Sequence, residues 1–171
     1  MTSEAVDARM MARCIELARA GGKAGEYPFA AIVCRGGVVI AEATNQVASE
    51  GDVTRHAEIV AISRAQRTIG SKDLSGCTLY TTVEPCPMCS FPIRETRISR
   101  VVFAISSPLM GGASRWDVLH DPGLSRHMPE VFGEPPQVID GFMRKEAARV
   151  WRRWNPIVWA VIRLRGVFGR K

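Results

Sequence analysis

The sequence predicts a three-layer α/β sandwich, in which helices cover both faces of one sheet. Two short runs rich in β-forming residues flank a turn and predict a hairpin. Further strand-like runs then alternate with segments of helical periodicity. The length of 171 residues and the 46% content of hydrophobic residues fit one domain with its own core. They exclude a disordered chain and a small disulfide scaffold.

The N-terminal part of the chain is predicted to form a helix followed by the hairpin. Apolar residues recur near helical spacing over residues 4–20, and two glycines follow as a stop. The hairpin strands are residues 29–34 and 38–43, on either side of a turn at residues 35–37. The polar stretch 44–54 that follows predicts a loop.

The middle of the chain is predicted to continue with a helix and a buried strand. Thr54 can cap a helix over residues 55–69, because its hydroxyl accepts from a free backbone N–H, and Gly70 ends that helix. Residues 77–83 are predicted to form the third strand, because β-branched and aromatic residues dominate this run.

A second helix–strand unit is predicted around three prolines. A short or kinked helix is expected over residues 87–97, because Pro87 suits a first helical turn whereas Pro92 in a helix interior costs about 3 kcal/mol. Residues 100–105 are expected to form the fourth strand, and residues 137–140 a weak fifth.

The C-terminal segment carries the basic charge of the chain. The formal net charge is +6, yet residues 142–171 hold nine basic and one acidic side chain, against 14 basic and 16 acidic in the rest. A helix is predicted over residues 142–154, which Pro156 breaks. We expect a main domain over residues 1–154 and a basic, tryptophan-containing tail over residues 155–171. The tail is expected to pack against its own sheet or a partner subunit in a homodimer, with nucleic acid or an anionic membrane surface as alternatives.

The sequence predicts neither export nor a membrane span. Acidic residues lie where a signal peptide would carry basic ones. The longest apolar run, residues 157–162, is far shorter than the roughly 20 residues of a transmembrane helix. We therefore expect a cytoplasmic protein with reduced thiols, in which Cys14, Cys34 and Cys77 fill the core.

Two short segments carry the candidate chemistry, and each opens a predicted helix. His56 and Glu58 begin one helix, and Cys86 and Cys89 begin the next. One imidazole and two thiolates can hold zinc and leave the fourth tetrahedral position for water, which is typical of catalytic zinc. Zinc lowers the pKa of such a water to about 7, and a nearby carboxylate can move its proton. A redox pair or half of a structural zinc site is the alternative, but no second ligand pair is present.

These segments resemble the zinc-dependent cytidine/purine deaminase superfamily over about residues 5–154. The motifs that carry the resemblance are His56–Glu58, Tyr80–Cys89 and Arg100–Phe103. The resemblance implies that His56, Cys86 and Cys89 hold Zn²⁺. It also implies that Glu58 is the catalytic proton shuttle and that the sheet is a five-stranded mixed sheet with helices on both faces.

Two branches of this superfamily are similar to the chain. Residues 28–31 and the full Glu-Pro-Cys-Pro-Met-Cys string are similar to bacterial guanine deaminases, whereas residues 116–123 are similar to bacterial tRNA adenosine deaminases. In both branches an Asn after the second strand contacts the purine, which implies that role for Asn45; a turn-forming Asn is the alternative. The tRNA branch usually carries Arg-Asp and then Lys after the fourth strand, where this chain has residues 105–108, Ile-Ser-Ser-Pro.

The sequence therefore favours a small aminated heterocycle as substrate, because this loop lacks the cations that would grip an extruded nucleotide. We expect a hydrolytic deaminase of a guanine-like purine or its nucleoside, which releases ammonia. The candidate substrate contacts are Asn45, Phe29, Ser106, Trp116 and Asp117. Phe29 and Trp116 could instead pack in the core. One alternative is a tRNA adenosine-to-inosine deaminase. A second, of another class, is a zinc-stabilised binding module without catalysis, which the retained Glu58 disfavours.

Overall fold

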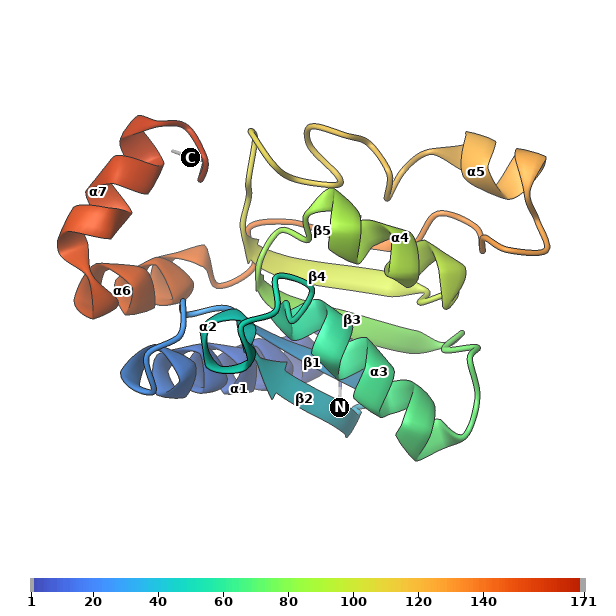
Figure 1. The fold of residues 1–171 in the computed structure, drawn as a ribbon. Helices are drawn as coiled ribbons and strands as arrows, with labels where there is room; N and C mark the ends of the chain where they lie inside the picture. The colour runs from blue at the N-terminus through green and yellow to red at the C-terminus, as the bar shows by residue number, and fades with distance from the viewer. Residues whose placement is uncertain (1, 170–171) are drawn as a thin grey trace.

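The computed structural model describes residues 2–169 and shows the sandwich that the sequence predicts (Figure 1). Within this range five strands form one mixed sheet in the order β2-β1-β3-β4-β5. β1 pairs antiparallel with β2 and β3, whereas β3–β4 and β4–β5 are parallel. The strands are β1 (Ala30–Arg35), β2 (Val38–Thr44), β3 (Cys77–Val83), β4 (Arg100–Ile105) and β5 (Gln137–Ile139). The carboxyl ends of β2, β3 and β4 therefore meet at one edge of the sheet.

Helices cover both faces of the sheet because its central strands are apolar on both sides. Along β1, Ile32 and Cys34 pack into one core cluster, whereas Ala31 and Val33 pack into the other. α1 and α6 cover the first face, and α3, with α4 packed beside it, covers the second. The helices are α1 (Ser3–Lys23), α2 (Val47–Glu50), α3 (Ala57–Ile69), α4 (Pro87–Glu95), α5 (Pro122–His127), α6 (Arg144–Trp154) and α7 (Pro156–Leu164).

The region before α3 differs from the prediction in two ways. The expected loop 44–54 contains the short helix α2. The expected cap at Thr54 is wrong, because the Thr54 hydroxyl donates to the Asp52 carboxylate at 2.7 Å and α3 begins only at Ala57. His56 is the N-cap residue, and its side chain makes no capping hydrogen bond. The imidazole is therefore free to point elsewhere.

The helix that contains Pro92 is short, as expected. α4 has nine residues and begins with Pro87 in its first turn. Near its end, the backbone N–H and the hydroxyl of Thr96 both donate to the Pro92 carbonyl, at 2.9 and 2.7 Å. Arg97 then turns the chain with φ of 60°, a left-handed conformation that ends the helix.

Pro156 breaks the C-terminal helix as predicted, but it also opens α7, which the sequence did not predict. The Asn155 side chain caps α7 by accepting from the N–H groups of Ile157 and Val158. Trp159 and Phe168 are buried in the first core cluster. The described part of the tail thus packs against the body; Arg170 and Lys171 lie outside the described residues, and the division at residue 154 stays a prediction.

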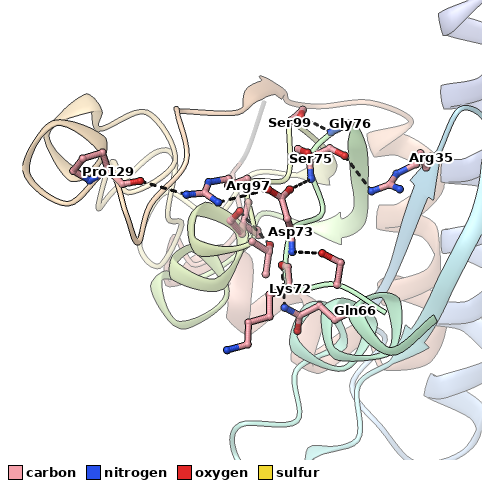
Figure 2. Close-up of polar contacts among 12 residues, drawn as sticks. Arg35, Gln66, Lys72, Asp73, Ser75, Gly76, Arg97, Ser99 and Pro129 are labelled. Carbon is pink, nitrogen blue, oxygen red and sulfur yellow. Dashed lines mark hydrogen bonds and ion pairs between the residues drawn. The ribbon is translucent and has the colours of Figure 1, made fainter. Parts of the chain in front are cut away.

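A polar network fixes the opposite edge of the sheet, at the amino ends of β3 and β4 (Figure 2). The Asp73 carboxylate accepts from the Ser75 N–H at 2.7 Å and lies 3.5 Å from the Arg97 guanidinium. Arg97 also donates to the Pro129 carbonyl, and the Gln66 amide donates to the Lys72 carbonyl. These contacts join the end of α3 to the loop before β3. In the described range, no helix is long and apolar enough to cross a membrane.

Candidate metal centre and active site

His56, Cys86 and Cys89 come together at the carboxyl edge of the sheet, where α3 and α4 begin. His56 is the N-cap residue of α3, and Cys86 is the N-cap residue of α4. The His56 Nδ1 lies 3.6 Å from the Cys86 Sγ and 3.5 Å from the Cys89 Sγ. The two sulfur atoms are 3.7 Å apart. The three predicted ligand residues thus present one atom each to a common point.

These distances fit a tetrahedral zinc ion. Zinc–sulfur bonds of about 2.3 Å and zinc–nitrogen bonds of about 2.0–2.1 Å place two ligand sulfurs about 3.8 Å apart, and sulfur and nitrogen about 3.6 Å apart. The separations between the three side chains lie within about 0.1 Å of these values. Two thiols and one imidazole are also ligands that zinc prefers. Three ligands leave the fourth position open.

The local electrostatics favour a thiolate at the start of α4. Hydrogen bonds from the Cys89 thiol and, second, from His56 outweigh the opposing effect of burial and lower the pKa of Cys86 to about 4. The first turn of α4 adds partial positive charge from its free N–H groups. The same Cys86 sulfur raises the pKa of His56 by accepting a hydrogen bond. A divalent cation would displace the remaining protons from His56 and Cys89, because metal ligands bind in their deprotonated forms.

Glu58 lies next to the three ligand atoms and is buried. Its Oε2 is 3.7 Å from the Cys89 sulfur, and its Oε1 is 3.2 Å from the Thr81 hydroxyl of β3. Burial raises the pKa of Glu58, because desolvation disfavours the carboxylate. A carboxyl group with a raised pKa beside an open ligand position is suited to take up and release a proton.

Glu84 organises the loop beyond the centre, a role that the sequence analysis did not assign. Its buried carboxylate accepts from the backbone N–H groups of Ser107, Ala113 and Ser114, at 2.6, 3.1 and 2.7 Å. A Cβ atom at Gly111 would lie 2.1 Å from this carboxylate, so the chain can approach only without a side chain there. In the sequence, the Glu that precedes Pro-Cys and the later Gly-Gly pair are the signal for this contact between Glu84 and the loop.

The structure places the five predicted substrate residues differently. Asn45 is buried just after β2, and Ser106 is half-buried just after β4, so both lie at the edge that carries the ligands. Phe29 packs against Trp151, with ring centroids 5.0 Å apart, which agrees with a core role. Trp116 is 58% exposed, so the core-anchor interpretation is wrong. Asp117 is exposed, and its carboxylate lies 3.1 Å from His120. Among the described contacts it makes no hydrogen bond to His56, Cys86 or Cys89.

Glu26 is a further residue that the sequence analysis missed. It is buried in the segment between α1 and β1, and its carboxylate accepts from the Asn45 side-chain amide at 2.8 Å. It also accepts from the N–H groups of Ala48 and Ser49 in α2, at 3.2 and 2.7 Å. Burial raises the pKa of Glu26, but these hydrogen bonds outweigh it and leave the pKa below its ordinary value. A lone Glu before the first strand offered no pattern that could predict this contact.

An α/β/α sandwich with a His/Cys/Cys centre at two helix N-termini and a buried carboxylate defines the class of zinc-dependent deaminases. The comparison with protein families agrees. The model of the cytidine and deoxycytidylate deaminase zinc-binding region matches residues 4–105, and the chain belongs to this family. It is a deaminase, a hydrolase acting on carbon–nitrogen bonds, with zinc as its cofactor.

Named relatives fall into both branches that the sequence resembles. A tRNA-specific adenosine deaminase of Aquifex aeolicus is 38% identical over 125 residues, which cover 71% of this chain and 83% of the relative. A guanine deaminase of Bacillus subtilis is 42% identical over 93 residues, which cover 54% of this chain and 60% of the relative.

A solved structure and a longer relative complete the comparison. A structure from a study of A-to-I editing by tRNA:A34 deaminases superposes with a TM-score of 0.75 at 31% identity, covering 84% of this chain and 99% of the other. A tRNA(Ile)-lysidine synthase of Deinococcus deserti is 36% identical over 143 residues, 83% of this chain. The chain spans only 25% of that relative's length.

Proposed function

We propose that this deaminase converts adenosine in a tRNA into inosine, with release of ammonia. The tRNA-specific adenosine deaminases of Aquifex aeolicus and Agrobacterium fabrum match over most of both chains and support this substrate, as does the tRNA:A34 deaminase structure. A guanine deaminase structure from Nitrosomonas europaea also matches over most of both chains, with a TM-score of 0.71, and supports the second candidate below. We rank tRNA adenosine, which the sequence left as an alternative, above the guanine-like substrate that the sequence favoured.

One structural observation carries the proposal. Trp116 is exposed, and the guanidinium of Arg115 lies 5.6 Å from the centre of its ring. Both residues belong to the loop that Glu84 holds against the segment leading into Cys86. An exposed indole with a stacked cation is suited to bind an unstacked base, a contact worth about 1–3 kcal/mol. A deaminase that acts on an extruded nucleotide needs such contacts to its neighbours.

The geometry of the metal centre suggests a role for each reacting group. We assign His56, Cys86 and Cys89 as the ligands of the ion, which when bound supplies Lewis acidity to a water molecule. Deamination replaces the exocyclic amine at C6 of adenine with the oxygen of a water molecule, and the amine leaves as ammonia. Glu58 takes one proton from the water and gives it to the ring nitrogen N1, and then carries the second proton to the leaving nitrogen. Thr81 holds the Glu58 carboxyl in place through its hydroxyl.

A free purine such as guanine is the second candidate, because residues 105–108 at the end of β4 carry no cation and the tail covers Ser106 and Ser107. The Ser107 hydroxyl donates to the Val167 carbonyl at 2.8 Å, and the Gly169 N–H donates to the Ser106 carbonyl at 2.9 Å. This closure favours a compact ligand. A homodimer and a cytoplasmic location stay predictions for either candidate.

Two assays in parallel decide between the candidates. The zinc-loaded protein is incubated with an anticodon stem–loop RNA that carries adenosine at the wobble position, and the RNA is sequenced for inosine. Adenosine, guanosine, guanine and cytosine are tested separately for ammonia release. Inosine in the RNA, absent with the Glu58→Gln variant, supports the proposal. Ammonia from guanine with unchanged RNA overturns it in favour of the second candidate, and no product in either assay favours the non-catalytic binding module.

A further inference from the structure

We propose that a cationic face formed by α1, α6 and α7 binds the phosphate backbone of the RNA whose base enters the zinc centre. This inference rests on the proposed function and adds a second contact surface to it. The face consists of Arg19, Lys23, Arg144, Lys145, Arg149, Arg152, Arg153 and Arg163. Figure 1 shows the three helices together at the end of the molecule away from α5.

The cations line two grooves on either side of α6. The first groove has a volume of about 610 Å³ and lies between α1 and α6, with Arg19 and Lys23 on one wall and Arg149 and Arg153 on the other. The second groove, about 270 Å³, lies between α6 and α7 and is lined by Arg152, Arg163 and further basic residues of α6. Arg149 lines both grooves, so the positive charge is continuous across α6.

These cations lack carboxylate partners, unlike several cations of the body. Arg13, Arg55 and Arg100 each lie 2.7 Å from a carboxylate oxygen. Within the described residues, no cation of the cationic face lies within 4.0 Å of a carboxylate, and Glu146 is the one acidic residue along its grooves. Unneutralised cations in a concave surface raise the local concentration of anions.

The core holds these grooves in shape. α6 turns Ala147, Val150 and Trp151 into the core, which leaves its basic residues on the outer side. α1 and α6 approach closely at Gly22, where a Cβ atom would lie 2.9 Å from the Trp154 ring. In α7, the guanidinium of Arg163 lies 5.6 Å from the centre of the Trp159 ring, which keeps its charge beside α6.

The cationic face also adjoins the edge of the sheet that carries the zinc ligands. The chain that leaves α7 reaches Phe168, whose ring packs 4.9 Å from Trp151 of α6, and then Gly169, which bonds to Ser106 after β4. Ser106 follows the strand that pairs parallel with β3, the strand leading to Cys86. The end of the tail thus connects the cationic face to the carboxyl edge of the sheet, where α3 and α4 present His56, Cys86 and Cys89.

The shape of the face favours RNA over a bilayer. α7 exposes Ile157, Val161 and Leu164, which would suit a lipid surface. The cations of α1 and α6, however, lie on the two walls of a groove. A sugar–phosphate backbone can enter a groove and meet cations from both sides, whereas the headgroups of a flat bilayer meet only its rims.

The test compares two pairs of charge neutralisations in the full chain. Arg149→Gln with Arg153→Gln removes two charges from the cationic face. Arg67→Gln with Arg126→Gln removes two charges from exposed positions on α3 and α5. An end-labelled tRNA with adenosine at the wobble position is titrated with each zinc-loaded protein between 50 and 200 mM salt. Thermal unfolding checks that both variants remain folded.

We expect the first pair to weaken tRNA binding about tenfold at low salt and to reduce the slope of log K against log salt by about 0.9 for each lost phosphate contact. The second pair should bind like the wild type. The proposal would be overturned if both pairs had the same tRNA affinity and the same salt dependence of binding. It would also be overturned if the wild type bound vesicles of anionic phospholipid but not tRNA. If tRNA binding depends on Arg149 and Arg153 but no inosine forms, the RNA surface stands and the proposed reaction alone fails.

Discussion

The side-chain amide of Asn45 donates a 2.8 Å hydrogen bond to the buried carboxylate of Glu26. The same carboxylate accepts from the backbone of α2, so the short helix and the loop after β2 are tied to one anion. Because its Nδ2 is engaged, the Asn45 amide has a fixed orientation at the edge of the sheet that carries the zinc ligands. Glu26 thereby fixes the orientation of the Asn45 amide, which we predict to contact the substrate.

The first prediction concerns Glu26→Gln. A glutamine amide cannot accept from all three donors, so Asn45 and the α2 backbone lose partners, and we expect unfolding free energy to fall by about 2 kcal/mol. If Asn45 contacts the base, KM should rise more than kcat falls. Steady-state kinetics and urea unfolding measure both effects. Glu42→Gln, which breaks an exposed pair with Arg13, is the control and should change little. An unchanged KM in Glu26→Gln would contradict the positioning role.

The second prediction concerns Glu58→Gln. The amide fills the same space but cannot carry the proton from water to the leaving amine, so kcat should fall by about 10²–10⁴-fold. Stability should not fall, because the variant removes a carboxyl group that burial disfavours in its charged form. Turnover, zinc content and thermal unfolding are measured on the same preparation. Full turnover with Gln at this position would exclude Glu58 as the proton shuttle.

The third prediction concerns the metal ligands. Cys86→Ser should lower the zinc content from one ion per chain to a small fraction and abolish turnover, because a thiolate is replaced by a poor zinc ligand. A chelator should produce the same loss in the wild type, together with a lower melting temperature. Cys77→Ala is the control, since Cys77 is buried in β3 away from the ligand set. Zinc loss in Cys77→Ala equal to that in Cys86→Ser would contradict the assignment.

The parts of the fold that the sequence predicted depend on local pattern. Runs of β-forming residues predicted the strands to within a residue or two. The spacing of Cys86 and Cys89, with a His at another helix start, was enough to predict that these three side chains come together. The parts that were missed depend on contacts between distant segments. α2 is held by Glu26, more than twenty residues earlier in the chain, and the loop that exposes Trp116 is held by Glu84.

The tail has one feature that depends on local pattern and one that depends on contacts between distant segments. Asn155 followed by Pro156 is a local signal for a new helix, since Asn caps a helix and Pro suits its first turn. The burial of Trp159 and Phe168 is not a local property, because it depends on the position of Trp151 and on the end of β4.

The fourth prediction follows from this packing. Phe168→Ala should reduce the unfolding free energy by about 3–4 kcal/mol, because it leaves a cavity beside Trp151. Leu164→Ala, at an exposed position of α7, should cost far less. We also expect removal of residues 156–171 to destabilise the chain and reduce its solubility. An unchanged unfolding midpoint in Phe168→Ala would show that the tail folds separately from residues 1–154.

The fifth prediction concerns the buried ion pair between Asp7 of α1 and Arg100 of β4. Two hydrogen bonds of 2.7 Å join them, and the Tyr80 hydroxyl donates a third to Asp7. The Arg100 hydrogen bonds lower the pKa of Asp7; burial opposes them, and Tyr80 adds to them.

The stability that this pair contributes is present above the unfolded pKa of about 3.9 and is lost as pH falls through the lower folded pKa of Asp7. Asp7→Asn should therefore cost about 3 kcal/mol at pH 7, because it leaves the half-buried Arg100 guanidinium without its carboxylate. Urea unfolding at pH 7 and near pH 3 should show the gap between wild type and variant narrowing with acid, and a gap that stays constant with pH would contradict this assignment.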